Sequence, residues 1–223
     1  MGGYGANNRR DDYYDESGSG LRMIRKSGIP FLYVLGLCSL IVGMICLGII
    51  TAYWAGITHP MCFLYAQSPS YDGFSIVYKF GSNLSNCYWV AYGAVPSAAI
   101  GLMCGVFYMM KLFGDPSDEH EEAAQKRNTK IILVAMSVAS LLLLAVCCTL
   151  AEGMRVTCTN MGINAVNGKA DNCYDKLDLR VAMYNLPVDT SSMIHASSGC
   201  LWTSMVAYTL LVIFHSVALC RFP

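Results

Sequence analysis

Charged residues are scarce in this sequence of 223 residues. Asp, Glu, Lys and Arg together make up 13% of the chain, whereas about 25% is usual in soluble globular domains. Basic and acidic residues are equal in number, so the formal net charge is zero. A chain without a basic excess has no general electrostatic attraction for nucleic acid. The scarcity of charge, with a mean hydropathy of +0.43, instead predicts a membrane protein.

The sequence also lacks the short motifs that accompany common chemistries. It contains no Gly-rich phosphate-binding loop, no CxxC pair and no HExxH. The histidines lie far apart along the chain, so no arrangement of nucleophile, base and orienting group is apparent. We therefore expect a non-enzymatic protein without a cofactor or a bound metal. The four histidines are His59, His120, His195 and His215.

Long apolar runs, in contrast, are present. A helix needs about 20 apolar residues to cross a bilayer, and the chain has several runs of that length. Because backbone groups in lipid can bond only to one another, each run should be a helix. The predicted fold is an all-α membrane protein, a four-transmembrane-helix bundle over residues 28–223 after a cytoplasmic disordered tail, residues 1–27. The predicted spans are residues 29–57, 88–110, 131–151 and 196–220.

Lysine and arginine are unevenly distributed between these spans. They precede the first span and lie close to the ends of the second and third spans, in the segment between the two. Only Lys79 lies between the first and second spans. Basic residues beside span ends favour the cytoplasm. We therefore expect both termini in the cytoplasm and residues 58–87 and 152–195 outside the cell.

The two predicted outer segments contain four of the eleven cysteines. An even set in an oxidising compartment favours disulfides, and four cysteines allow three connectivities. Zinc is disfavoured because no histidine stands at zinc-finger spacing. We favour Cys62–Cys87 and Cys158–Cys173, because each bond closes its own outer loop.

Two further features fall in the first outer segment. Residues 70–80, SYDGFSIVYKF, combine β-prone residues with partial alternation, which favours a β-hairpin. Asn83-Leu84-Ser85 is an N-glycosylation sequon on the outer side. Asn83 is therefore a possible glycosylation site, although its closeness to the second span restricts the access of the glycosylating enzyme.

Small residues recur every four positions on the second predicted span. Gly93, Ser97, Gly101 and Gly105 form one continuous face, and such faces let helices approach closely in lipid. Packing within one four-helix bundle is the simpler interpretation, and association with another subunit is the alternative. Pro96 in the same span favours a kink.

His215 lies well inside the fourth predicted span and is the one Asp, Glu, His, Lys or Arg residue in it. A buried ionisable group in a membrane points to function by default. No acidic partner accompanies it in the spans, so we favour a packed, hydrogen-bonded histidine over a proton path. Few intramembrane charges also argue against a transporter or a voltage sensor.

Short motifs in both outer segments resemble one group of membrane proteins. PMCFLYA and NCYW supply one cysteine pair, TCTN and DNCYDKLDL supply the other, and CLWTS returns the chain to the membrane. This order is similar to the transmembrane protein 179 family and to the arthropod tetraspan proteins called Pasiflora. The positions that carry the resemblance are Cys62, Cys87, Cys158, Cys173 and Trp202.

The Pasiflora resemblance implies a structural role in septate junctions, which seal the space between neighbouring cells. We expect a plasma-membrane protein at lateral cell contacts that sits in the lipid bilayer, associates with other junctional membrane proteins or with itself, and supports a paracellular barrier. The alternatives are an auxiliary subunit of an ion channel or receptor, and a vesicle-trafficking tetraspan.

Overall fold

The fold was analysed in a computed structural model of the chain. The structure describes residues 27–56, 60–71, 76–81, 83–113, 121–162, 173–174, 177–178 and 188–220. The predicted cytoplasmic tail lies outside the described residues except for its last residue, Ser27.

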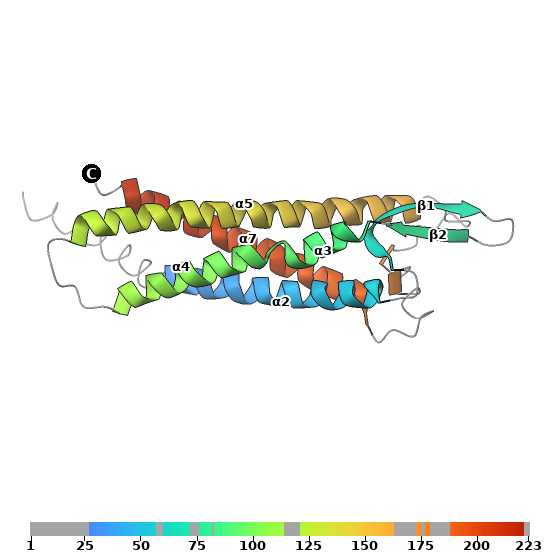
Figure 1. The fold of residues 1–223 in the computed structure, drawn as a ribbon, viewed down its shortest axis with the longest axis horizontal. Coiled ribbons are helices and arrows are strands. Elements are labelled where there is room, and N and C mark those ends of the chain that lie inside the picture. Colours follow the sequence, from blue (N-terminus) through green and yellow to red (C-terminus); the bar gives the residue numbers. More distant parts are fainter. Residues whose placement is uncertain are drawn as a thin grey trace, which may run out of the picture.

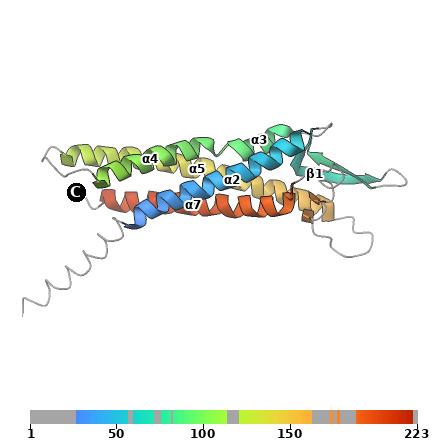
Figure 2. The ribbon, with the colours of Figure 1, turned by 90° about the horizontal axis from the view of Figure 1, so that it is seen from below.

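The described part of the chain is a bundle of long helices that run alternately in opposite directions (Figure 1). Helix α2 lies beside α4 and α7, and α5 lies beside the same two helices on the other side. The start of α2 and the end of α7 lie at one end of the bundle, and a β-hairpin lies at the other, which we call the hairpin end (Figures 1 and 2). The helices are α2 (Ile29–Ala55), α3 (Leu84–Tyr92), α4 (Val95–Phe113), α5 (Glu121–Gly162) and α7 (Thr190–Cys220).

Four stretches in these helices are long and apolar enough to cross a membrane, which confirms the predicted number of spans. Between 28% and 39% of each apolar window is buried inside the bundle, so most of each window faces outward. The outward side chains are themselves apolar, as on α5, where Val134 and Leu141 are 64% and 66% exposed. An apolar exterior of this extent indicates a multi-pass membrane protein, because water would not solvate it favourably.

Most of the helices extend past the predicted span limits. The helical stretches apolar enough to cross a membrane are Ile29–Ala55, Leu84–Lys111, Arg127–Met161 and Thr190–Cys220, and the predicted limits of 29–57, 88–110, 131–151 and 196–220 stay predictions. The largest differences are at the hairpin end, where α5 continues eleven residues past 151 to Gly162 and α7 begins six residues before 196. Hydropathy marks where lipid ends, whereas a helix continues for as long as its buried face finds partners.

The second span is broken into two helices, α3 and α4. The break falls at Gly93 and Ala94, between the end of α3 at Tyr92 and the start of α4 at Val95. Pro96 explains it, because proline has no N–H to donate and its ring clashes with the carbonyl four residues earlier. The predicted kink is thus a two-residue break in the helix, and Gly93 N still donates to Trp89 O across its start (2.7 Å).

The all-α prediction also needs correction, because a two-stranded antiparallel sheet is present. Strand β1 (Cys62–Tyr71) pairs with β2 (Ile76–Gly81), as the predicted hairpin required. The register places Cys62 opposite Gly81 and Tyr71 opposite Ile76, with irregularities on either side of Gln67. The hairpin extends beyond the helix ends, so it is the most distal described part of the chain (Figure 2).

The centre of the bundle is built around Tyr208 of α7, which is fully buried. Its ring lies between two glycines on neighbouring helices: a Cβ on Gly36 of α2 would lie 2.8 Å from Tyr208 Cε1, and a Cβ on Gly101 of α4 would lie 2.7 Å from Cζ. Both distances are shorter than real side chains allow. Glycine at both positions is therefore a condition for the three helices to meet at this spacing.

Replacing Gly101 with Ala should destabilise the bundle, because the new methyl group overlaps Tyr208. We expect the free energy of unfolding to fall by about 1–3 kcal/mol, the usual cost of overpacking. The measurement is thermal or denaturant unfolding of the purified chain in detergent micelles.

Gly48→Ala on α2 is the matched control, because a Cβ there meets nothing within 4 Å. Its stability should stay within about 0.5 kcal/mol of the native chain. Adding Tyr208→Phe to Gly101→Ala removes the overlapping hydroxyl and should restore part of the loss. An equal loss of stability in Gly101→Ala and Gly48→Ala would contradict the close packing of Tyr208 against Gly101.

Candidate functional site

The base of the hairpin is buried in an aromatic cluster at the hairpin end. The indole of Trp54, in the last turn of α2, contacts the rings of Phe63 on β1 and Phe80 on β2 edge-on, with centroid separations of 6.2 and 5.0 Å. Trp54 is 1% exposed, and its Nε1 donates a hydrogen bond to Thr190 Oγ1 at the start of α7 (3.4 Å). One side chain thus joins α2, both strands and α7.

Thr157 of α5 ties the backbone of β1 to the bundle. Its buried hydroxyl accepts a hydrogen bond from Ala66 N (3.2 Å) and lies within donating distance of Phe63 O (3.2 Å) and of Gly153 O in its own helix (2.9 Å). One turn further along α5, Asn160 Nδ2 donates to Ala66 O. The strand is therefore held on α5 by both polar groups of a single residue, Ala66.

Glycine allows the strands to approach each other and α5. A Cβ on Gly153 would lie 3.0 Å from Leu64 Cδ2, and a Cβ on Gly81 would overlap the Leu64 carbonyl oxygen. Next to Leu64, Tyr65 has a positive φ of 58°, a conformation that non-glycine residues seldom adopt. This unusual backbone coincides with the register irregularity between Cys62 and Gln67, where β1 bends onto α5.

Both disulfides lie at the hairpin end, with the pairing favoured from the sequence: Cys62–Cys87 and Cys158–Cys173. Neither joins two loop residues, because Cys87 lies in α3 and Cys158 lies in α5. The bonds therefore fasten the first strand and the segment at residues 173–174 to the helices. The other seven cysteines are free, and they lie in α2, α4, α5 and α7.

The start of α7 is fixed by two aspartates. Asp178 Oδ1 accepts from Ser191 N (3.0 Å), and Asp189 Oδ1 accepts from Ser192 N (3.0 Å). Ser192 Oγ also donates to the other carboxylate oxygen of Asp189 (2.7 Å). Helix N-termini leave amides without partners, and these carboxylates satisfy two of them. The hydrogen bonds from the Ser192 amide and hydroxyl hold the pKa of Asp189 below its usual value of 3.8.

Three of the four small residues predicted as a packing face contact other helices of the same chain. Ser97 Oγ donates to Ala139 O of α5 (2.9 Å), Gly101 faces Tyr208, and Gly105 lies against Tyr33 of α2. Gly93 lies at the break before α4, and a Cβ there would meet only its own neighbour Trp89. This face is used inside the bundle rather than left open.

His215 is buried, with 4% of its surface exposed, and lies five residues before the end of α7. Its Nε2 hydrogen-bonds with the Tyr33 hydroxyl (3.0 Å), and its ring lies 5.9 Å from that of Tyr108. The three side chains come from α7, α2 and α4. The group is a polar contact between three helices, in keeping with the packed histidine favoured from the sequence.

The remaining predicted positions lie on the surface. Asn83 is exposed and caps α3, with its Oδ1 accepting from Ser85 N (3.0 Å). Glycosylation of Asn83 stays a prediction. Trp202 is 38% exposed on α7 and lines a shallow groove between α2 and α7.

Sequence reasoning missed the part of α5 that receives the hairpin. The buried residues Leu150, Met154, Thr157 and Met161 continue at helical spacing past the last predicted span residue. That spacing was a readable signal of a helix with a buried face. It was missed because residues 152–195 were assigned to a loop on hydropathy alone.

The chemistry that this region offers is binding by shape, hydrogen bonds and ring contacts. Within the described ranges, no three His, Cys, Asp or Glu side chains lie close enough to hold a metal ion.

Comparison of the chain with protein-family models, with curated proteins and with solved structures gives no match. The resemblance to the transmembrane protein 179 and Pasiflora proteins therefore stays a prediction.

Thr157→Val should loosen the hairpin, because the change removes the hydroxyl and leaves the buried Ala66 amide without its acceptor. An unsatisfied buried donor costs about 1–3 kcal/mol. We expect lower thermal stability and faster hydrogen exchange of the β1 amides. Thr159→Val is the control, because Thr159 is exposed and bonds only within α5, to Arg155 O. Unchanged exchange at Ala66 in Thr157→Val would contradict this role.

Asp189 should make the first turn of α7 sensitive to acid. Because the pKa of Asp189 is lowered in the folded chain, its stabilising contribution is complete above pH 3.8 and is lost as the pH falls through the lowered pKa. Hydrogen exchange at Ser192, corrected for the intrinsic rate, should accelerate in that range. Asp189→Asn keeps an accepting oxygen but cannot titrate, so its exchange should lose this pH dependence. The same acid response in Asp189→Asn would rule out Asp189 as the cause.

Proposed function

We propose that the protein is a non-enzymatic component of a septate-type cell–cell junction, where it assembles with other junctional membrane proteins and supports the paracellular barrier. In this proposal the protein sits in the lateral plasma membrane with both termini in the cytoplasm and the hairpin outside. The uneven distribution of Lys and Arg supports the orientation. The order of the cysteine motifs, with its resemblance to Pasiflora proteins, supports the junction.

The observation that carries the proposal is the anchoring of the hairpin to the transmembrane helices. β1 is bonded to α3 through Cys62–Cys87 and to α5 through Thr157, and Trp54 of α2 packs on both strands. A preorganised element loses less conformational entropy on binding than a free loop does. Extended strands are also a common means of recognition between proteins. A fixed hairpin projecting from the bundle suits a protein whose role is to bind others.

The membrane-facing surfaces support lateral assembly. Helices in lipid associate by close packing at small residues. Ser97, Gly101 and Gly105 of α4 are occupied inside the bundle, but Gly48 on α2 and Gly199 on α7 have nothing within 4 Å of the position of a Cβ. Among the glycines of the described helices, those of α2 and α7 rather than those of α4 are therefore open to a neighbouring chain.

The proposal is tested by imaging the endogenous tagged protein in a polarised barrier epithelium, with photobleaching at the lateral membrane. A sharp lateral band that recovers slowly is expected, because a junctional complex is immobile. Diffuse signal with fast recovery, or intracellular puncta, would contradict the proposal. Co-purification of a pore-forming or receptor subunit instead of adhesion proteins would favour an auxiliary subunit.

A variant separates the hairpin from the rest of the chain. Replacing residues 67–79 with a Gly/Ser linker of equal length leaves Cys62, Cys87, Ala66 and the helices unchanged. The expected result is normal delivery to the cell surface with loss of the slowly recovering fraction. Thr159→Val is the control and should keep slow recovery. Slow recovery in the linker variant would show that the hairpin does not carry assembly.

A further inference from the structure

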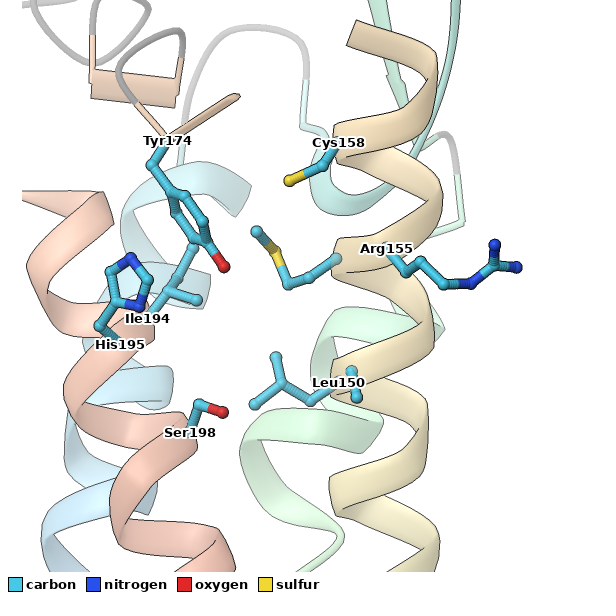
Figure 3. A pocket seen from close by; sticks show the side chains of 9 residues that line it. Leu150, Arg155, Cys158, Tyr174, Ile194, His195 and Ser198 are labelled. Carbon is cyan, nitrogen blue, oxygen red and sulfur yellow. The ribbon is translucent and has the colours of Figure 1, made fainter. Parts of the chain in front are cut away.

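A cavity of about 220 Å³ lies between α5 and α7 at the hairpin end. Its floor is apolar and buried: Leu150, Met154 and Ile194 are 2%, 6% and 1% exposed. Two hydroxyl-bearing side chains, Tyr174 above and Ser198 on α7, point into the space (Figure 3). The cavity thus has apolar walls with hydroxyl groups on one side.

The charged side chain in the lining, Arg155, does not face the cavity. Its guanidinium points away (Figure 3) and donates to both carboxylate oxygens of Glu152, at 2.8 and 2.7 Å. With that charge directed outward and paired, the interior offers hydroxyl groups and carbon. A neutral ligand therefore fits the interior better than an anionic one, whose desolvation would go uncompensated.

The same ion pair locates the cavity in the membrane. The Arg155 and Glu152 side chains are 68% and 50% exposed, and exposed charges on a membrane helix belong at the water interface, not in the hydrocarbon. Leu150 of the cavity floor precedes Glu152 by two residues on the lipid side. The cavity therefore spans the boundary between lipid and water.

The roof of the cavity is fixed in place. Tyr174 follows Cys173, which is bonded to Cys158 of α5. On the other side, the Tyr174 ring contacts the His195 ring of α7, with centroids 4.2 Å apart. The Tyr174 hydroxyl is held over the space between the helices by contacts to both walls, which is the preorganisation that a binding site needs.

We propose that this cavity binds a lipid of the sterol class. The sterol hydroxyl would hydrogen-bond to the Tyr174 hydroxyl at the outer end, and its rigid apolar rings would lie on Met154, Ile194 and Leu150, next to Ser198. Complete small-molecule pockets measure about 300–1,000 Å³, so the cavity takes the polar end and the first rings, and the rest of the sterol lies along α5 and α7 in the bilayer. A phospholipid would bring a charged phosphate and two chains. The assignment does not depend on the junctional role.

The experiment uses the full chain in nanodiscs with a photoreactive diazirine sterol, followed by mass-spectrometric mapping of the labelled peptides. Label is expected on the peptides of α5 and α7 that contain Met154 and Ser198, and excess unlabelled sterol should remove it. Ser198→Phe places a ring in the cavity and should reduce labelling about tenfold or more, because the ring would occupy the space that the sterol needs.

Thr203→Phe is the matched control, because Thr203 is on the same helix but lines the separate α2–α7 groove. Its labelling should match the native chain. Tyr174→Phe removes one hydroxyl and should weaken sterol competition about fivefold, the effect of one hydrogen bond. Thermal unfolding and the Cys158–Cys173 bond are checked in each variant, so that a folding defect is recognised.

Three outcomes would overturn the assignment. The first is equal, competable labelling of the native chain and Ser198→Phe. The second is label confined to the groove lined by Leu32 and Thr203. The third is competition by an anionic phospholipid rather than by sterol, which would mean that the site recognises a charged headgroup.

Discussion

The bundle depends on the fit of one ring, that of Tyr208, between two glycines. Helices in lipid gain little from hydrophobic burial, so their association rests on close packing. Tyr208 of α7 fills the space left by Gly36 of α2 and Gly101 of α4, and its hydroxyl donates a long hydrogen bond (3.5 Å) to Ser97 O. Ser97 in turn donates to Ala139 O of α5. One chain of contacts thus passes through all four spans.

The hairpin end is held by different forces from the centre. There, aromatic rings, two disulfides and hydrogen bonds to strand backbone replace the ring-on-glycine packing. The difference follows from the surroundings, because water competes for polar groups at this end and does not in the lipid. The hairpin is consequently joined to the bundle by contacts specific enough to keep its position, which is what both a protein partner and a bound lipid would require.

The sequence predicted what depends on local pattern and missed what depends on tertiary contact. Four apolar runs were enough to count the helices that could cross a membrane, and the expectation that each disulfide closes its own outer segment was enough to pair Cys62 with Cys87. The end of α5 was not visible to hydropathy, because Thr157 is polar and its burial comes from β1. The small-residue spacing predicted that Gly101 allows close helix packing. It did not predict the partner, Tyr208, because that residue lies over a hundred positions away in the sequence and is brought next to Gly101 by the fold.

The break at Gly93–Ala94 has a mechanical consequence together with the Cys62–Cys87 bond. Tension that pulls the hairpin ends of α2 and α3 apart is carried by that covalent bond. Without it, the 25-residue separation between these cysteines would extend to about 85 Å before resisting. The short helix α3 is therefore tied to the first strand, so that a pull on the hairpin reaches α3 through the disulfide. Such a pull would meet the break at Gly93–Ala94 before it reached α4.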